Sequence, residues 1–451
     1  MYNAWQAGNY DSAVTAVNLK AEKSIDSKDE LLWRLEQGAI LSAVGDVEGS
    51  LRAFDRAEEL VNRYEEEAKL QVGGEALALL TTQANLPYKG RAYDKIMMNS
   101  YKALNYLLLS DPDNARVELN RAFQRQKDAV VANQKKIEKS LKAAEEAKQG
   151  NLQSDDGSVA PSYDVNRAQN DAKFSTAANA ELAKVDERLL SYADYVNPFS
   201  VFLEGLFFSH LGLDGSDIEH ARQSFERVKG MSPGTYISAD HAMAEAMANG
   251  AKAETLTYII FATGKAPTRD QIRIDIPLFL LTDEASYIGV AFPKLKYHDQ
   301  YISRMTAVSS GGESYSTERL CSMDAIISRD FKNAWPTVIT KTLLTSATKA
   351  LAGRAAEEAA KRSGNQWAVL AARVASTAAQ ASSNIADLRT WITLPKEISY
   401  IRMPTPSDGL LTLRVGTNQQ KTNVTPGKTN IIMVRSVNDI SLPIIEQFTL
   451  N

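Results

Sequence analysis

The sequence has very few of the residues from which most catalytic and metal sites are built. Its 451 residues include one cysteine, Cys321, and four histidines. A single thiol excludes an internal disulfide and a cysteine-rich zinc site. Cys321 has no adjacent histidine in the sequence and precedes a predicted helix. We therefore expect a buried, unreactive thiol rather than a nucleophile.

Long apolar runs and a strong charge of one sign are also missing. No run approaches the roughly 18 apolar residues of a membrane span. The net charge of −4 is small for this length, so no nucleic-acid partner is expected. The start of the chain has neither the charged nor the apolar region of a signal peptide. It fits a cytoplasmic protein or the mature part of an exported one.

Motifs that bind phosphate or dinucleotides are absent too. Gly311-Gly312 lacks the lysine and hydroxyl of a P-loop, and Gly73-Gly74 lacks dinucleotide-loop spacing. His210 and His220 flank an acidic turn, but their spacing matches no helical ligand pair. We expect an aspartate-capped turn there and a surface loop at His298. The sequence therefore predicts no catalytic residue, no cofactor and no metal.

The most informative feature that is present is a helix pair at residues 32–58. Its tight turn is Gly45-Asp46, and Gly38 is small enough for the two helices to approach closely while Leu41 and Phe54 fill the seam. This pattern is typical of a tetratricopeptide repeat, a unit that buries its apolar face only by stacking on neighbours. Stacks of such repeats usually bind partner proteins.

Three further segments carry the same signal. Gly8 lies 37 residues before Gly45, close to the usual repeat period of about 34. Residues 93–123 form a pair broken at Ser110-Asp111-Pro112, and residues 198–228 form another. Four units predict a small helical solenoid.

A long helical hairpin is predicted between the third and fourth units. Residues 115–195 contain two amphipathic segments, joined by a Gly-, Ser- and Asp-rich tip at 150–162. The hairpin is interpreted either as an arm that projects toward a partner or as a hairpin packed on the repeats.

The second part of the chain is rich in strands. Residues 271–279 alternate Ile272, Ile274 and Ile276 with charged residues, which predicts a strand with one buried face. Further strands are expected near 255–264, at 287–295 and in 398–451. An alanine-rich helical hairpin at 324–390 is expected as an insertion between strands of one sheet. Its many charges oppose a lipid-buried helix and favour packing within the protein or against a second copy.

The predicted fold class is therefore α+β. The TPR-like helical domain, a solenoid with its long helical hairpin, is expected over 1–250. The β-rich module with its Ala-rich helical insertion is expected over 251–451. A possible homo-oligomer through the Ala-rich hairpin follows from this arrangement.

Several phrase-like segments resemble one protein family. They are the repeat start, Gly264 to Pro267 with the RIDIP strand, AFPKL at 291–295, and Asp387, Arg389, Trp391, Leu394 and Pro395. In this arrangement the chain resembles a poorly characterised family of bacterial exported lipoproteins with amino-terminal tetratricopeptide-like repeats. The resemblance implies a periplasmic protein, anchored to the outer membrane by lipid, among other envelope proteins. The lipidated cysteine of that family is not in this sequence, so the anchor is inferred. Residues 387–391 also fit a buried ion pair under a tryptophan.

The functional prediction is a non-enzymatic scaffold or adaptor of the bacterial cell envelope. Its candidate partner-binding residues are polar positions on the first repeat helices: Arg34, Gln37, Asn99, Asn105 and Glu204. One alternative is a self-assembling component of a larger envelope or secretion complex. A second is a cell-wall glycan-binding protein or hydrolase using Asp270, Asp275 and Asp283, although their spacing gives no catalytic pair. A cytoplasmic location also stays open.

Overall fold

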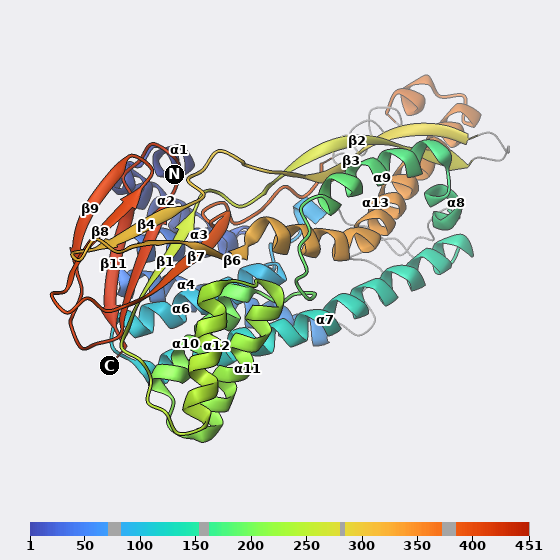
Figure 1. Ribbon diagram of the computed structural model, residues 1–451. Helices are drawn as coiled ribbons and strands as arrows, with labels where there is room; N and C mark the ends of the chain where they lie inside the picture. The colour runs from blue at the N-terminus through green and yellow to red at the C-terminus, as the bar shows by residue number, and fades with distance from the viewer. Residues whose placement is uncertain (71–82, 153–161, 280–284, 372–384, 451) are drawn as a thin grey trace.

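The computed structural model describes residues 1–70, 83–152, 162–279, 285–371 and 385–450, and its fold is α+β (Figure 1). Helices occupy the amino-terminal part, and strands follow with one long inserted helix. The helices are α1 (Tyr2–Gln6), α2 (Tyr10–Lys23), α3 (Glu30–Ala43), α4 (Val47–Leu70), α6 (Ala92–Leu108), α7 (Pro112–Lys148), α8 (Val165–Gln169), α9 (Ala172–Asp186), α10 (Pro198–Leu211), α11 (Gly215–Met231), α12 (Thr235–Ala248) and α13 (Met323–Arg362), with a 3-10 turn, η1, at Gln83–Asn85.

The strands within the described residues form three sheets. A five-stranded sheet has the order β11-β10-β1-β7-β6, a four-stranded sheet has the order β5-β4-β8-β9, and β2 and β3 pair with each other. Their bounds are β1 (Leu256–Thr263), β2 (Thr268–Phe279), β3 (Ala285–Lys296), β4 (Met305–Ser309), β5 (Ser314–Ser316), β6 (Glu318–Ser322), β7 (Glu397–Pro404), β8 (Leu410–Val415), β9 (Asn418–Asn423), β10 (Asn430–Ser436) and β11 (Ile444–Thr449).

Adjacent helices pair closely where the sequence places glycine opposite phenylalanine. A Cβ atom built on Gly38 of α3 would lie 2.5 Å from the ring of Phe54 on α4. A Cβ atom on Gly205 of α10 would lie 2.6 Å from the ring of Phe225 on α11. The predicted turn at Gly45 has a φ of +83°, and Asp111 caps α7 with Pro112 in its first turn. These helix pairs and turns are therefore confirmed.

A side chain at position 38 should weaken the packing between α3 and α4. We expect Gly38→Ala to lower the free energy of unfolding by roughly 1–3 kcal/mol, because the added methyl overlaps the buried Phe54 ring. Gly230→Ala in α11 is the matched control, since its Cβ would meet nothing within 4 Å. It should be neutral or stabilising by up to about 1 kcal/mol. Equal urea midpoints for the two variants would contradict the close packing.

The central strand β1 is buried on both faces, which explains its nearly continuous apolar sequence. Ile259 and Phe261 face the four-stranded sheet and join the core between the two sheets. Tyr258 and Ile260 point the opposite way and belong to the core shared with the helices. The five-stranded sheet is thus the middle layer of the body.

One apolar core joins the two halves of the chain. It contains residues from the helix pairs, such as Leu35 and Phe202, together with Tyr400 of β7 and Ile431 of β10. Phe202 and Tyr400 have ring centroids 4.6 Å apart. The sheet therefore packs directly on the helical layer. The division at residues 250 and 251 stays a prediction.

A projecting arm extends from the body to the right in Figure 1 and has a core of its own. We define the arm as the distal part of α7, α8, α9, the β2–β3 ribbon and α13. Ala144 of α7, Phe174 of α9, Phe292 of β3 and Trp335 of α13 pack into this second core. Four separate chain segments therefore build the arm, where the sequence predicted a helical hairpin alone.

Two details of the sequence prediction were wrong. Residues 165–195 are not one helix, because Asp171 caps a new helix, α9, by accepting hydrogen bonds from the backbone amides of Lys173 and Phe174. Residues 385–390 are not helical. Two predicted segments fall partly outside the described residues: the second alanine-rich helix at 372–384, and the tip predicted at 150–162 at 153–161. Strands β4, β5, β6, β9 and β11 were not predicted individually. The insertion of α13 between the neighbouring strands β6 and β7 is confirmed.

Candidate functional site

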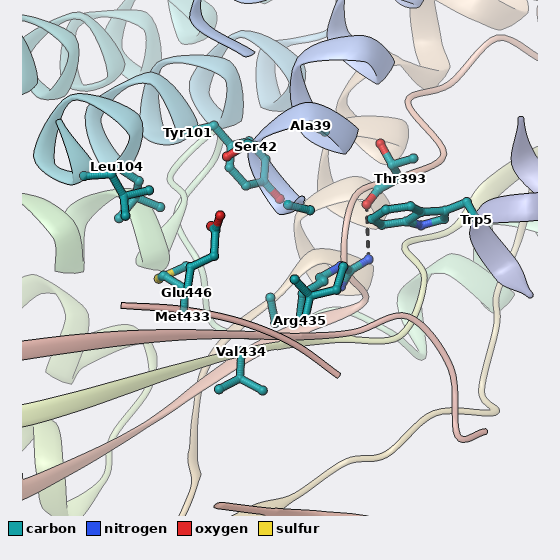
Figure 2. A pocket seen from close by; sticks show the side chains of 14 residues that line it. Trp5, Ala39, Ser42, Tyr101, Leu104, Thr393, Met433, Val434, Arg435 and Glu446 are labelled. Carbon is teal, nitrogen blue, oxygen red and sulfur yellow. Dashed lines mark hydrogen bonds between the residues drawn. The ribbon is translucent and has the colours of Figure 1, made fainter. Parts of the chain in front are cut away.

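A small pocket lies where the sheet meets the first helix pairs (Figure 2). It is partly open to solvent, and its cavity volume is about 60 Å³. Helices α3 and α6 form one side, and strands β10 and β11 form the other. Its lining consists of Trp5, Ala39, Ser42, Ala43, Tyr101, Leu104, Leu108, Ala262, Thr393, Met433, Val434, Arg435, Ile444 and Glu446.

Glu446 is the carboxylate of this pocket. It lies opposite Met433 in the β10–β11 register, and its side chain points from the sheet toward Tyr101 (Figure 2). No hydrogen bond or ion pair joins it to the residues that the structure describes. Burial raises the pKa of this carboxyl to about 7. Gly45 makes room for it, because a Cβ atom there would lie 3.2 Å from Glu446 Oε1.

Arg435 is the cationic side chain of the pocket wall. Its Nη2 donates to the carbonyl oxygens of Gly264 at 3.0 Å and Thr393 at 3.1 Å. Its Nη1 is buried and has no partner among the described residues. Burial lowers the pKa of this guanidinium. Although Arg435 and Glu446 line the same pocket, they form no ion pair within 4.0 Å in the described structure.

A buried carboxylate on α3 holds one wall of the pocket in place. Glu36 accepts hydrogen bonds from the backbone amide of Ile392 at 2.6 Å, and from the backbone amide at 3.2 Å and the hydroxyl at 2.7 Å of Thr393. Burial nevertheless raises the pKa of Glu36 to about 7. These bonds fix the turn after Trp391, and with it the Thr393 carbonyl that Arg435 contacts.

The unpaired Glu446 should make stability depend on pH. Its pKa of about 7 in the folded protein exceeds the ordinary value of 4.5, so its neutral form favours folding at pH 4 and this contribution is lost as pH rises to 7. We expect Glu446→Gln to raise the free energy of unfolding by roughly 1–2 kcal/mol at pH 8, after allowance for solvent screening, and to leave it unchanged at pH 4. Urea titrations at both pH values measure this. A stabilisation of equal size at pH 4 would contradict it.

The structure separates the five predicted partner-binding residues. Arg34 and Gln37 are partly exposed, and Arg34 Nη1 donates to Gln37 Oε1 at 2.9 Å. Asn99, Asn105 and Glu204 are buried and cannot contact a partner in this conformation. The reason is that the sheet and neighbouring helices cover the repeat face on which they were expected to lie.

Asn99 instead belongs to a buried polar network between α4, α6 and α7. Lys102 Nζ lies 2.6 Å from Glu58, 2.8 Å from Glu118 and 2.9 Å from Asp55. Burial lowers the pKa of Lys102, but the adjacent carboxylates outweigh this and raise it overall. Asn99 donates to Glu58 and Glu118. The network stabilises the helical layer, so these polar residues have structural partners.

Asn105 and Glu204 differ in whether their buried polar atoms have hydrogen-bond partners. Asn105 accepts from the Ser42 hydroxyl and donates to the Ser50 hydroxyl, both at 2.8 Å. Neither buried oxygen of Glu204 has a hydrogen-bond partner among the described residues, and His220 Nε2 lies 3.6 Å away. Burial raises the pKa of Glu204.

The remaining sequence candidates are dispersed. Asp270 pairs with Lys294 and Asp275 with Lys173, while Asp283 lies outside the described residues. Asp214 caps α11 as predicted. His298 Nε2 lies 2.9 Å from the Thr268 hydroxyl. Among the residues that the structure describes, no group of three or more His, Cys, Asp or Glu side chains could hold a metal ion.

The buried thiol predicted at Cys321 is confirmed, and the buried ion pair under a tryptophan predicted at 387–391 is partly correct. Cys321 is buried, and burial raises the pKa of its thiol to about 12. Asp387 and Arg389 form an ion pair at 2.8 Å. Trp391 is buried, as predicted, but it packs against Phe54 and Tyr101 on the helical layer.

The comparisons with known proteins give no match: no family model, no curated protein and no solved structure is significantly similar to this chain. The site must therefore be judged from its own geometry. No helix within the described ranges has the length and apolar character needed to cross a membrane. Among the described lining residues, the pocket has one carboxylate, one guanidinium and otherwise apolar or hydroxyl groups. This set suits binding better than paired acid–base chemistry.

Sequence reasoning missed the pocket residues Arg435 and Glu446. Both occur in strands, and no motif links them to Trp5 or Tyr101. The sequence signal that was available is the single charged residue in each of these two strands.

Proposed function

We propose that this chain is a non-enzymatic scaffold or adaptor that binds other proteins of the bacterial cell envelope. The helix pairs α3–α4, α6–α7 and α10–α11 are, in this proposal, TPR-like repeats. The observation that carries it is the projecting arm, because four chain segments converge there on a core separate from the core of the body. Such an extension presents surface away from the body (Figure 1).

The partner surface proposed here is the arm and not the inner face of the repeats. The first helices of the pairs contribute Leu35, Leu104 and Phe202 to the core under the sheet. That inner face is therefore already covered. On the arm, Leu141 of α7 is 59 % exposed and Trp367, just beyond α13, is 79 % exposed. Exposed large apolar side chains of this kind are frequent anchors of protein interfaces.

The location in the cell envelope rests on the resemblance to exported lipoproteins. A lipid anchor of the kind found in that family would place the protein at the periplasmic side of the outer membrane. No membrane contact by a helix is needed for this arrangement.

Point variants of the arm test this function. Leu141→Ser and Trp367→Ala should each weaken capture of the partner from envelope extracts by about tenfold or more, since buried apolar anchors carry much of an interface's affinity. Leu213→Ser is the matched control, because Leu213 is 82 % exposed on the body. Unchanged capture by both arm variants, with unchanged thermal unfolding, would refute the arm as the partner surface.

Self-assembly is a second candidate because of one feature of α13. Its last turns expose a stripe of small residues: Ala352, Ala355, Ala356 and Ala359. Stripes of small residues permit close helix contact with a second copy. Ala356→Glu should then reduce concentration-dependent dimers in sedimentation experiments. A chain that stays monomeric at all concentrations would exclude this candidate.

A further inference from the structure

The pocket between α3, α6 and the sheet contains a carboxylate without a partner. Glu446 points into it, and the described residues supply neither a hydrogen-bond donor nor a cation to its oxygens (Figure 2). Glu446 is partly exposed, and a carboxylate that has lost part of its water contact is stabilised by a nearby cation or donor, because desolvation is costly. The position opposite Met433 in the middle of β11 fixes this side chain toward the helices.

The residues that line the pocket around Glu446 indicate which kind of ligand could pair with its carboxylate. Trp5 and Tyr101 contribute aromatic rings, and Leu104 and Met433 contribute apolar surface. Aromatic faces attract cations, and apolar walls accept an alkyl group. Arg435 lies on the sheet side of the pocket, as Glu446 does, where the carbonyl oxygens of Gly264 and Thr393 hold it, and its Nη1 is covered. Arg435 is therefore not placed to neutralise Glu446 or to receive an anion.

We propose that this pocket binds an organic ammonium group on a short alkyl stem, with Glu446 as its counter-ion. The cavity of about 60 Å³ accommodates a few water-sized groups, which fits a short primary amine better than a large ring. The ammonium would donate to the Glu446 oxygens, and the stem would lie against Leu104 and Met433. Gly45 adjoins this site, because a side chain there would crowd Glu446 Oε1.

The ammonium can come from two sources with the same chemistry. One is a free small amine. The other is the lysine side chain of a partner polypeptide, for which the exposed Ile440 and Leu442 in the loop before Ile444 offer nearby apolar contacts. This inference is independent of the arm, since the pocket belongs to the body.

Calorimetric titration of the full chain tests the proposal with two probes. The first is n-butylammonium, and the second is an end-blocked Gly-Lys-Gly peptide; 1-butanol serves as the uncharged control. We expect saturable one-to-one binding of at least one ammonium probe and none of 1-butanol. Preference for butylammonium identifies a free amine as the source, and preference for the peptide identifies a lysine side chain.

Variants decide whether Glu446 is the counter-ion. Glu446→Gln keeps the side-chain shape and should weaken binding about tenfold to hundredfold, as expected for loss of a charged hydrogen bond. Glu245→Gln, an exposed position on α12, should bind as the unmodified chain does. Thermal unfolding of Glu446→Gln at pH 4, where the substitution is expected to leave stability unchanged, would confirm that it folds. Equal binding by Glu446→Gln, or no saturable binding of either probe at millimolar concentration, would overturn the proposal.

Discussion

Lys102→Met should destabilise the protein by roughly 3 kcal/mol. Lys102 is almost fully buried, and its ammonium lies within 2.9 Å of three carboxylates. Removing it leaves Glu58 and Glu118 buried without their main counter-ion, which commonly costs several kcal/mol. Arg121 still contacts both carboxylates, so part of the compensation remains. Urea unfolding measures the change.

An exposed ion pair provides the control for this effect. Arg52 and Glu48 are paired at 3.7 Å on the surface of α4, and both side chains are more than two-thirds exposed. Arg52→Met should change the free energy of unfolding by less than about 0.5 kcal/mol, since surface pairs contribute little. A Lys102→Met protein as stable as Arg52→Met would mean that the buried network does not hold the helical layer together.

Trp391→Ala should lower the free energy of unfolding by a similar amount, about 3–5 kcal/mol, because the packing of the ring is lost. The ring of Trp391 is buried between the helices and the sheet, 6.0 Å from the centroid of Phe54 and 5.9 Å from that of Tyr101. Truncation leaves a large cavity at this junction. Its Nε1 also donates to the Thr393 hydroxyl, so the pocket wall would shift.

Trp367 is the matched tryptophan for this comparison. Because it is 79 % exposed, Trp367→Ala should leave the free energy of unfolding within about 0.5 kcal/mol. Thermal unfolding of the two variants shows which tryptophan stabilises the core and which is free to contact a partner. Equal losses of stability would contradict the burial difference on which the functional proposal depends.

Local patterns in the sequence identified many individual elements correctly. The pairing of Gly38 with Phe54 depends on two nearby helices, and the cap at Asp111 involves adjacent residues, so both can be read from short segments. The alternation of Ile272, Ile274 and Ile276 likewise predicts the buried face of β2. Each of these features is decided within about 25 residues of chain.

Features set by distant contacts could not be predicted in this way. The parallel pairing of β1 with β10 joins residues more than 170 positions apart, such as Thr257 and Asn430. Asn99 has the polar character of a surface residue, and only the approach of Glu58 and Glu118 explains its burial. The pocket likewise exists only after β11 has paired with β10 and packed near α3. Its Glu446 carries no local signal of function.

The proposal that partners bind the arm is tested most directly by hydrogen–deuterium exchange of the full chain with and without the captured partner. Backbone protection should increase in residues 130–148 of α7 and in 351–371, with no change in α3 and α6 under the sheet. Protection confined to α3 and α6, with none on the arm, would contradict the account and return the binding surface to the inner face of the repeats.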